Sequence, residues 1–151
     1  MNARLDPFAA APAQMKAWMG ASLATSSSLD PVLVSLVEVL TSQINGCANC
    51  INMHTAFARE RGETEQRLYL LPAWREAPFY SARERAALAW TEALTRVEQS
   101  QVPDEVYAEA RQQFSEKELV DLTLAIVAIN GWNRLCVAFR RQPGHYKPAG
   151  H

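Results

Sequence analysis

The chain has 151 residues, of which 48% are hydrophobic, and its 15 Lys and Arg residues nearly balance 16 Asp and Glu residues. This size and apolar content suit one domain, so we expect a single domain over 1–151, with a core at about 30–140 and a loose tail at 141–151. A charge near zero without a long basic block argues against nucleic-acid and membrane-surface binding.

The N-terminal segment does not look like a secretory signal, because Pro7, Pro12, Gln14 and Lys16 interrupt its apolar residues. The longest apolar run of the chain, at 122–129, is far shorter than the roughly 20 residues that span a bilayer. We therefore expect a cytoplasmic protein that has no membrane partner.

The first helix signal is Asp30-Pro31, an N-cap residue followed by proline at the first helical position. This helix is predicted to end near Asn45, where an Asn-Gly pair favours a turn. A second helix is predicted from about Cys47 to a C-terminal cap at Gly62.

Further helical patterns follow along the rest of the chain, at 64–71, 81–98, 103–114 and 115–139. Ser81 with Glu84, and Ser115 with Glu118, have the spacing of capping boxes. Period-two alternation never persists long enough to predict a strand, so the predicted fold class is an all-α helical bundle.

The segment 118–139 is apolar on nearly all sides, and a helix of this kind has to be buried. In a domain this small, it indicates packing between subunits as well as within one. We therefore expect a homo-oligomer.

Two cysteines and a histidine stand close together in the stretch "CANCINMH" at 47–54. Residues three and four positions apart share a helix face, so Cys47, Cys50 and His54 are predicted to line one stripe. The first turn of a helix stabilises a thiolate, and a neighbouring histidine stabilises it further or moves its proton. These are the requirements of thiol redox chemistry.

A close pair of cysteines can also bind a metal, attach a haem, belong to a thioredoxin fold or only pack in the core. A structural zinc site needs four ligands and this segment offers three, with no second Cys pair elsewhere, so we expect no metal. Covalent haem attachment needs histidine directly after the second cysteine, where Ile51 stands. A thioredoxin fold would need preceding strands. Two core cysteines that act only as small hydrophobes stay an alternative.

The stretches 42–95 and 122–140 resemble the AhpD-like alkylhydroperoxidase proteins of the carboxymuconolactone decarboxylase family. The most specific part is "SQINGCANCINMH", and the likeness extends from about 30 to 140. The resemblance implies an all-helical fold, a trimer or hexamer, no metal or organic cofactor, and a dithiol reductant as partner.

In family terms, Cys50 would attack a hydroperoxide and become a sulfenic acid, Cys47 would resolve it as an intramolecular disulfide, and His54 would assist proton transfer. The helix dipole alone favours Cys47 as the thiol of lower pKa. The residues by themselves therefore leave the order of the two cysteines open.

The chain also departs from the family pattern. The family glutamate twelve positions before the first cysteine is replaced by Ser35, and a family histidine before the second cysteine is replaced by Asn49. Glu38 lies one helical turn beyond Ser35, where it either approaches the same region or is a solvated surface charge, the alternative we favour for a glutamate. A weakened proton relay puts efficient turnover in question.

Several other residues stand near the motif or share its chemistry. Gln43 and Asn45 either support the Cys turn by hydrogen bonds or only end the helix. Cys136 is expected to be a separate, buried and inert thiol. His145 and His151 lie in the tail, where a ligand role would need an ordered partner.

The sequence thus predicts a thiol peroxidase that reduces small organic hydroperoxides through its CxxC pair. One alternative is a redox-sensing or structural oligomer that uses the same pair without turnover. Another is a lactone decarboxylase, which the CxxC pair argues against.

Overall fold

Helices make up most of the computed structural model, which describes residues 2–25 and 28–144. They are α1 (Pro7–Ala10), α2 (Pro12–Thr25), α3 (Pro31–Ile44), α4 (Ala48–Glu60), α5 (Glu65–Leu70), the 3-10 turn η1 (Leu71–Ala73), α6 (Ala82–Thr95), α7 (Val97–Ser100), α8 (Asp104–Gln113) and α9 (Glu116–Ala138). No strand occurs in these described ranges, so the predicted all-α class is confirmed. His145 and His151 lie outside the described residues.

Three of the predicted helices begin at a residue whose side chain caps the helix. Asp30 accepts hydrogen bonds from the main-chain N–H groups of Val32 and Leu33, at 2.9 and 3.0 Å. Ser81 and Ser115 each form a complete capping box, with Glu84 and Glu118 respectively. Each cap satisfies N–H groups that have no partner inside the helix, which fixes where α3, α6 and α9 begin.

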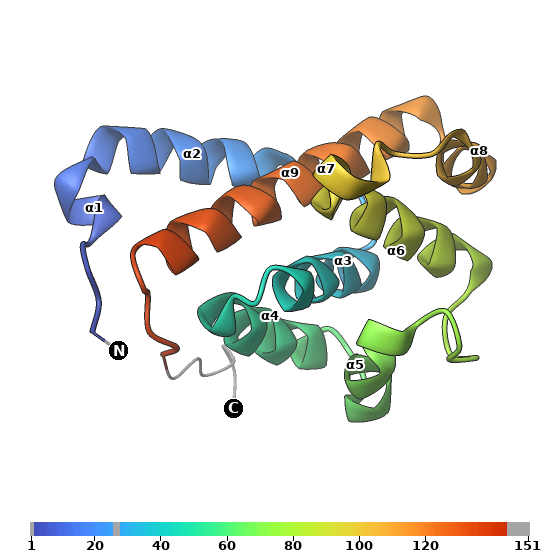
Figure 1. Cartoon of the computed structure of the whole chain (residues 1–151), viewed down its shortest axis with the longest axis horizontal. Helices are drawn as coiled ribbons and strands as arrows, with labels where there is room; N and C mark the ends of the chain where they lie inside the picture. Colours follow the sequence, from blue (N-terminus) through green and yellow to red (C-terminus); the bar gives the residue numbers. More distant parts are fainter. Residues whose placement is uncertain (1, 26–27, 145–151) are drawn as a thin grey trace.

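Helix α3 lies at the centre of the fold and packs against α4, α6 and α9 (Figure 1). Nine of its 14 residues are buried, because two separate clusters of apolar side chains form on its two sides. Leu33, Val34 and Val37 pack with residues of α6, α8 and α9, whereas Leu36 and Val39 pack with residues of α4, α5 and η1. The Cys turn that follows α3 therefore starts from a fixed position.

Two parts of the helical pattern differ from the prediction. The segment predicted as one helix over 81–98 breaks at Arg96, between α6 and α7. The N-terminal segment forms α1 and α2, for which the sequence pattern predicted no helix. Helix α2 runs beside α9, where Gly131 allows close approach: an added Cβ there would lie 2.5 Å from the Trp18 ring.

Helix α9 packs against α2, α3, α6 and α8, as expected for a core helix. Among the described residues it alone is long and apolar enough to cross a membrane, a test that core helices of soluble proteins also pass. It is not buried on all sides in the single chain, because Val120, Leu124 and Val127 are about half exposed.

Candidate functional site

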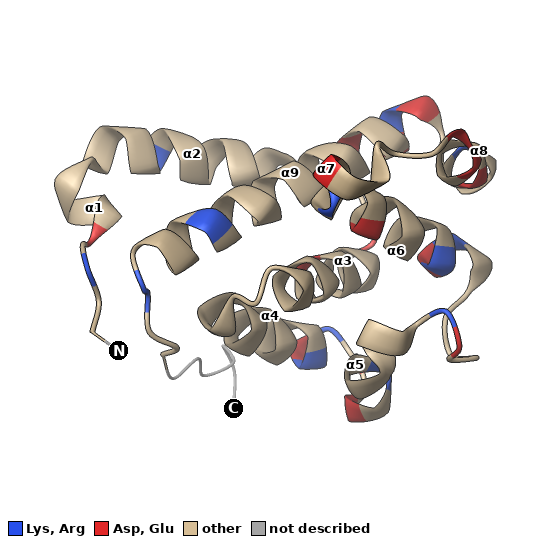
Figure 2. Cartoon of the chain, viewed as in Figure 1, with Lys and Arg blue, Asp and Glu red and all other residues tan. Residues whose placement is uncertain are grey.

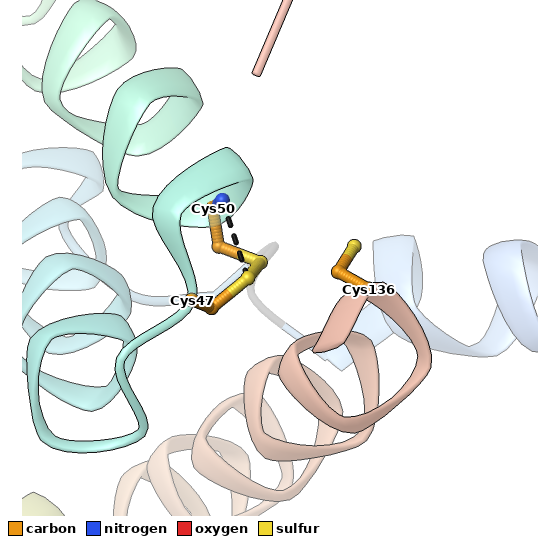
Figure 3. A group of neighbouring side chains, drawn as sticks. All are labelled: Cys47, Cys50 and Cys136. Atoms are coloured by element: carbon orange, nitrogen blue, oxygen red, sulfur yellow. Dashed lines mark hydrogen bonds between the residues drawn. A yellow bond between two sulfur atoms is a disulfide. The ribbon is translucent and has the colours of Figure 1, made fainter. Parts of the chain in front are cut away.

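The two cysteines of the CxxC pair lie at the tight turn between α3 and α4 and are joined by a disulfide bond (Figure 3). Gly46 has φ +66°, a left-handed conformation that favours glycine. The Gly46 N–H donates to the Gln43 carbonyl, and the Cys47 N–H donates to the Ser42 carbonyl, at 3.2 and 3.0 Å. These two bonds form a Schellman motif, which places Cys47 directly after α3.

Cys47 is also the N-cap residue of α4, and it stands only three positions after Ile44, the last residue of α3. Its Sγ accepts a hydrogen bond from the Cys50 N–H at 3.3 Å. Both cysteines are 1% exposed. When the disulfide is reduced, the N-terminus of this 13-residue helix stabilises a thiolate on Cys47.

His54 lies one turn beyond Cys50 on α4 and contacts Glu38 of α3. The His54 Nδ1 atom is 3.0 Å from Glu38 Oε2, and the two side chains are 9% and 23% exposed. The contact does not have the geometry of a hydrogen bond, so Nδ1 is buried without a hydrogen-bond partner in this arrangement. Glu38 is therefore not a solvated surface charge, the alternative that the sequence favoured.

The other predicted support residues lie around this pair. Ser35 is buried on α3, where its hydroxyl accepts a hydrogen bond from Arg61 at 2.8 Å, and the same Arg61 nitrogen is 3.9 Å from Glu38. Asn49 is buried, and its amide donates to Cys136 Sγ at 3.7 Å. The Gln43 side-chain oxygen is buried without a hydrogen-bond partner, whereas the Gln43 main-chain carbonyl accepts the Gly46 N–H.

A polar network ties the Cys turn to α9. The Asn45 amide donates to the side-chain oxygens of Asn130 and Asn133, each at 2.9 Å. The Asn133 amide in turn donates to the Ser42 hydroxyl at 3.1 Å. Sequence reasoning considered Asn45 but missed Asn130 and Asn133, whose spacing of three residues within an apolar helix was the available signal.

Cys136 does not stand apart from the CxxC pair, contrary to the expectation of a separate, buried thiol. It is partly exposed on α9, and the Sγ atoms of Cys47, Cys50 and Cys136 all lie within 4.8 Å of one another (Figure 3). Within the described ranges, no other His, Cys, Asp or Glu side chain joins this group of potential metal ligands. Three sulfurs are one ligand short of a closed structural zinc site.

A pocket of about 720 Å³ opens beside the disulfide. Cys50, Cys136, His54, Glu38, Arg61 and Arg141 contribute to its lining, whereas Cys47 does not reach it. The remaining walls are largely apolar and include Leu5, Phe8, Met53, Phe57, Trp132 and Phe139. This volume and lining are typical of a site for a small organic molecule.

The N-terminal segment closes one side of this pocket. Phe8 of α1 stacks on Trp132 with ring centroids 6.3 Å apart, and the Trp132 indole donates to the Ser22 hydroxyl at 3.0 Å. The Arg4 N–H donates to the carbonyl of Phe139, the C-cap residue of α9, and the Arg4 guanidinium donates to the carbonyl of Ala138, the last residue of α9. The α1 and α2 helices are therefore part of the site.

Comparison with known proteins gives close relatives. The model of the carboxymuconolactone decarboxylase family matches residues 9–93. The uncharacterized protein YdfG of Bacillus subtilis is 45% identical over 139 residues, which cover 91% of this chain and 95% of YdfG.

Solved structures have the same fold. A protein of unknown function from Agrobacterium tumefaciens, named as a candidate antioxidant defence protein AhpD, has a TM-score of 0.92 and 38% identity, over 96% of this chain and 100% of that one. An alkylhydroperoxidase AhpD core from Ralstonia eutropha JMP134, an uncharacterized peroxidase-related protein, has a TM-score of 0.79 and 18% identity, over 91% of this chain and 74% of that one. The chain therefore belongs to the carboxymuconolactone decarboxylase family and has the AhpD-like helical fold.

Proposed function

We propose that this protein is a thiol peroxidase that reduces organic hydroperoxides through Cys50 and Cys47. The observation that carries the proposal is the position of the disulfide, which lies at the wall of an apolar pocket beside the contact between His54 and Glu38. The family relationship to AhpD-like proteins supports the same class of activity.

In the proposed cycle, the Cys50 thiolate attacks the terminal oxygen of the hydroperoxide. The O–O bond breaks, the alcohol leaves after it takes a proton, and Cys50 becomes a sulfenic acid. Cys47 then attacks the Cys50 sulfur, water leaves, and the disulfide forms. A dithiol donor returns both cysteines to thiols. Cys50 is assigned the first attack because it lines the pocket and Cys47 does not.

His54 is proposed to move the protons of these steps, and Glu38 to position its ring. A carboxylate 3.0 Å from Nδ1 favours one orientation of the ring, which proton transfer by His54 needs. Glu38 would thus take over the relay role that Ser35, in the family glutamate position, has lost.

The pocket favours a hydroperoxide with an apolar body. Its walls bring together aromatic and aliphatic side chains from α1, α4 and α9, and the cationic side chains of Arg61 and Arg141 also contribute to the lining. The volume of about 720 Å³ is more than hydrogen peroxide would need.

We further propose a cytoplasmic homo-oligomer, a trimer or hexamer, that assembles through α9. Val120, Leu124 and Val127 lie on one side of this helix and are 57%, 45% and 53% exposed. The stretch of α9 between Asp121 and Arg134, which includes Leu124 and Val127, has no charged residue, and α2 has few, whereas α6 and α8 carry many (Figure 2).

The test is intact mass and thiol counting on the reduced protein after one equivalent of cumene hydroperoxide. We expect the native chain to lose two thiols and two hydrogens while cumyl alcohol forms. The Cys47→Ser/Cys136→Ser variant should trap a sulfenic acid on Cys50, and Cys50→Ser should leave the hydroperoxide intact. If hydroperoxide persists while an added dithiol–disulfide couple still oxidises and reduces the pair, the peroxidase proposal fails and a redox-sensing oligomer takes its place.

A further inference from the structure

The third cysteine of the chain lies beside a disulfide that it does not belong to. Cys136 Sγ is within 4.8 Å of both disulfide sulfurs, although Cys136 stands 86 positions after Cys50 in the sequence. Cys50 and Cys136 line the same pocket and Cys47 does not, and Figure 3 shows Cys136 on a separate helix beside the disulfide. A disulfide bond is about 2.0 Å long, so the remaining gap is at most about 2.8 Å. A rotamer change at one or both cysteines spans a gap of this size.

We propose that Cys136 is a third redox-active cysteine, which exchanges with the disulfide to form a Cys50–Cys136 bond and free Cys47. The proposal rests on the proposed function only in taking the CxxC pair as a working redox pair. The Cys136 thiolate attacks Cys50 Sγ, the Cys47–Cys50 bond breaks, and the electron pair leaves on Cys47. One disulfide is exchanged for another, so no external oxidant or reductant is consumed.

The surroundings of Cys47 suit it as the leaving group of this exchange. It occupies the N-cap of α4, and its sulfur already accepts the Cys50 N–H at 3.3 Å. A thiolate released there is stabilised by the end of the helix, and a stabilised thiolate leaves faster. The proton that Cys136 gives up to solvent can return to Cys47.

Three features of its surroundings act on the ionisation of Cys136. Burial raises the pKa of the Cys136 thiol. The positive charge of Arg141 and the hydrogen bond from Asn49 both lower this pKa in part. Asn49 stands on the first turn of α4, between the two cysteines of the pair, so one amide links the third sulfur to the CxxC turn.

The same geometry gives a Cys50 sulfenic acid two partners. Attack by Cys136 on that sulfur releases water and forms Cys50–Cys136, as attack by Cys47 forms Cys47–Cys50. A second resolving thiol shortens the life of the sulfenic acid and protects it from further oxidation to a sulfinic acid.

The test uses diamide, a thiol oxidant that does not depend on hydroperoxide chemistry. The reduced native protein receives one equivalent, is quenched in acid, labelled with N-ethylmaleimide in denaturant and mapped as peptides. We expect label on Cys47 in at least several per cent of molecules, together with a Cys50–Cys136 linked peptide. Label on Cys136 alone would overturn the exchange.

The variant arm uses Cys47→Ser, with Cys47→Ser/Cys136→Ala as its matched control. The single variant should lose two hydrogens and link Cys50 to Cys136, at a rate within about 100-fold of the native pair; the control should form no intramolecular bond. If both thiols of the folded single variant stay available for labelling, the proposal fails. A Cys50–Cys136 bond formed by diamide, with hydroperoxide left unconsumed, would instead overturn the peroxidase function alone.

Discussion

Glu38 of α3 and His54 of α4 contact each other, with 3.0 Å between Glu38 Oε2 and His54 Nδ1, next to the Cys47–Cys50 disulfide. The two residues come from the two helices that the Cys turn connects. A carboxylate that stands nine positions before Cys47 thus reaches the histidine seven positions after it.

We expect Glu38→Gln to lower the rate of hydroperoxide reduction roughly tenfold, and His54→Gln to lower it at least about 100-fold, because general acid–base steps contribute about 10²- to 10⁴-fold. The double variant should be no slower than His54→Gln alone, since Glu38 acts through His54. Peroxide consumption is the measurement, with Glu65→Gln on the exposed surface of α5 as control. Independent, multiplying effects of Glu38 and His54 would contradict the positioning role.

Gly46→Ala should lower the free energy of unfolding by about 1–2 kcal/mol, which is the cost of a left-handed conformation for a residue with a Cβ. An added Cβ would contact nothing within 4 Å, so the effect belongs to the backbone alone. Gly20→Ala in α2 is the matched control, because its Cβ is equally unhindered and alanine favours a helix by up to about 1 kcal/mol. Urea unfolding of the reduced proteins measures both; equal effects at the two glycines would contradict the account.

The pH dependence of stability should include a contribution from Glu84. Burial raises the pKa of this carboxyl, but hydrogen bonds from Arg67 and from the Ser81 N–H outweigh it and hold the pKa below the ordinary 4.5. A lowered pKa means that the native state favours the carboxylate, so its stabilisation is complete above pH 4.5 and is lost as the pH falls through the lowered pKa.

Glu84→Gln should therefore be less stable at pH 7, by about 1 kcal/mol for the weakened cap. The difference from the native protein should shrink as the pH approaches 3. Thermal unfolding from pH 3 to 7 measures the difference, and Glu109→Gln on the exposed side of α8 serves as control. A difference that grows toward acid pH would contradict the assigned sign.

Val127→Glu should shift the protein toward monomers, because it places a charge in the apolar stripe of α9 that we propose as the subunit contact. Size-exclusion chromatography with light scattering gives the mass. Val97→Glu is the matched control, since Val97 is 51% exposed but lies on α7. If both variants keep the native mass, α9 is not the interface.

The sequence by itself determined the features that depend on neighbours three or four residues apart. Asp30, Ser81 and Ser115 cap helices because their partners are the next N–H groups along the chain. The Cys47–Cys50 disulfide likewise joins two residues only three positions apart, within a single helical turn. The weak helical pattern of 12–25, preceded by Ala11, whose side chain has no oxygen to cap a helix, explains why α2 was not predicted.

Only the tertiary structure decided which distant side chains share the site. The contacts of Glu38 with His54, of Asn45 with Asn133, and of Cys136 with the disulfide each join two different helices. Whether such residues meet depends on how far each helix is rotated about its axis and how it crosses its neighbour. That geometry is set by the packing of the two clusters around α3, a property of all the core side chains together rather than of any local motif.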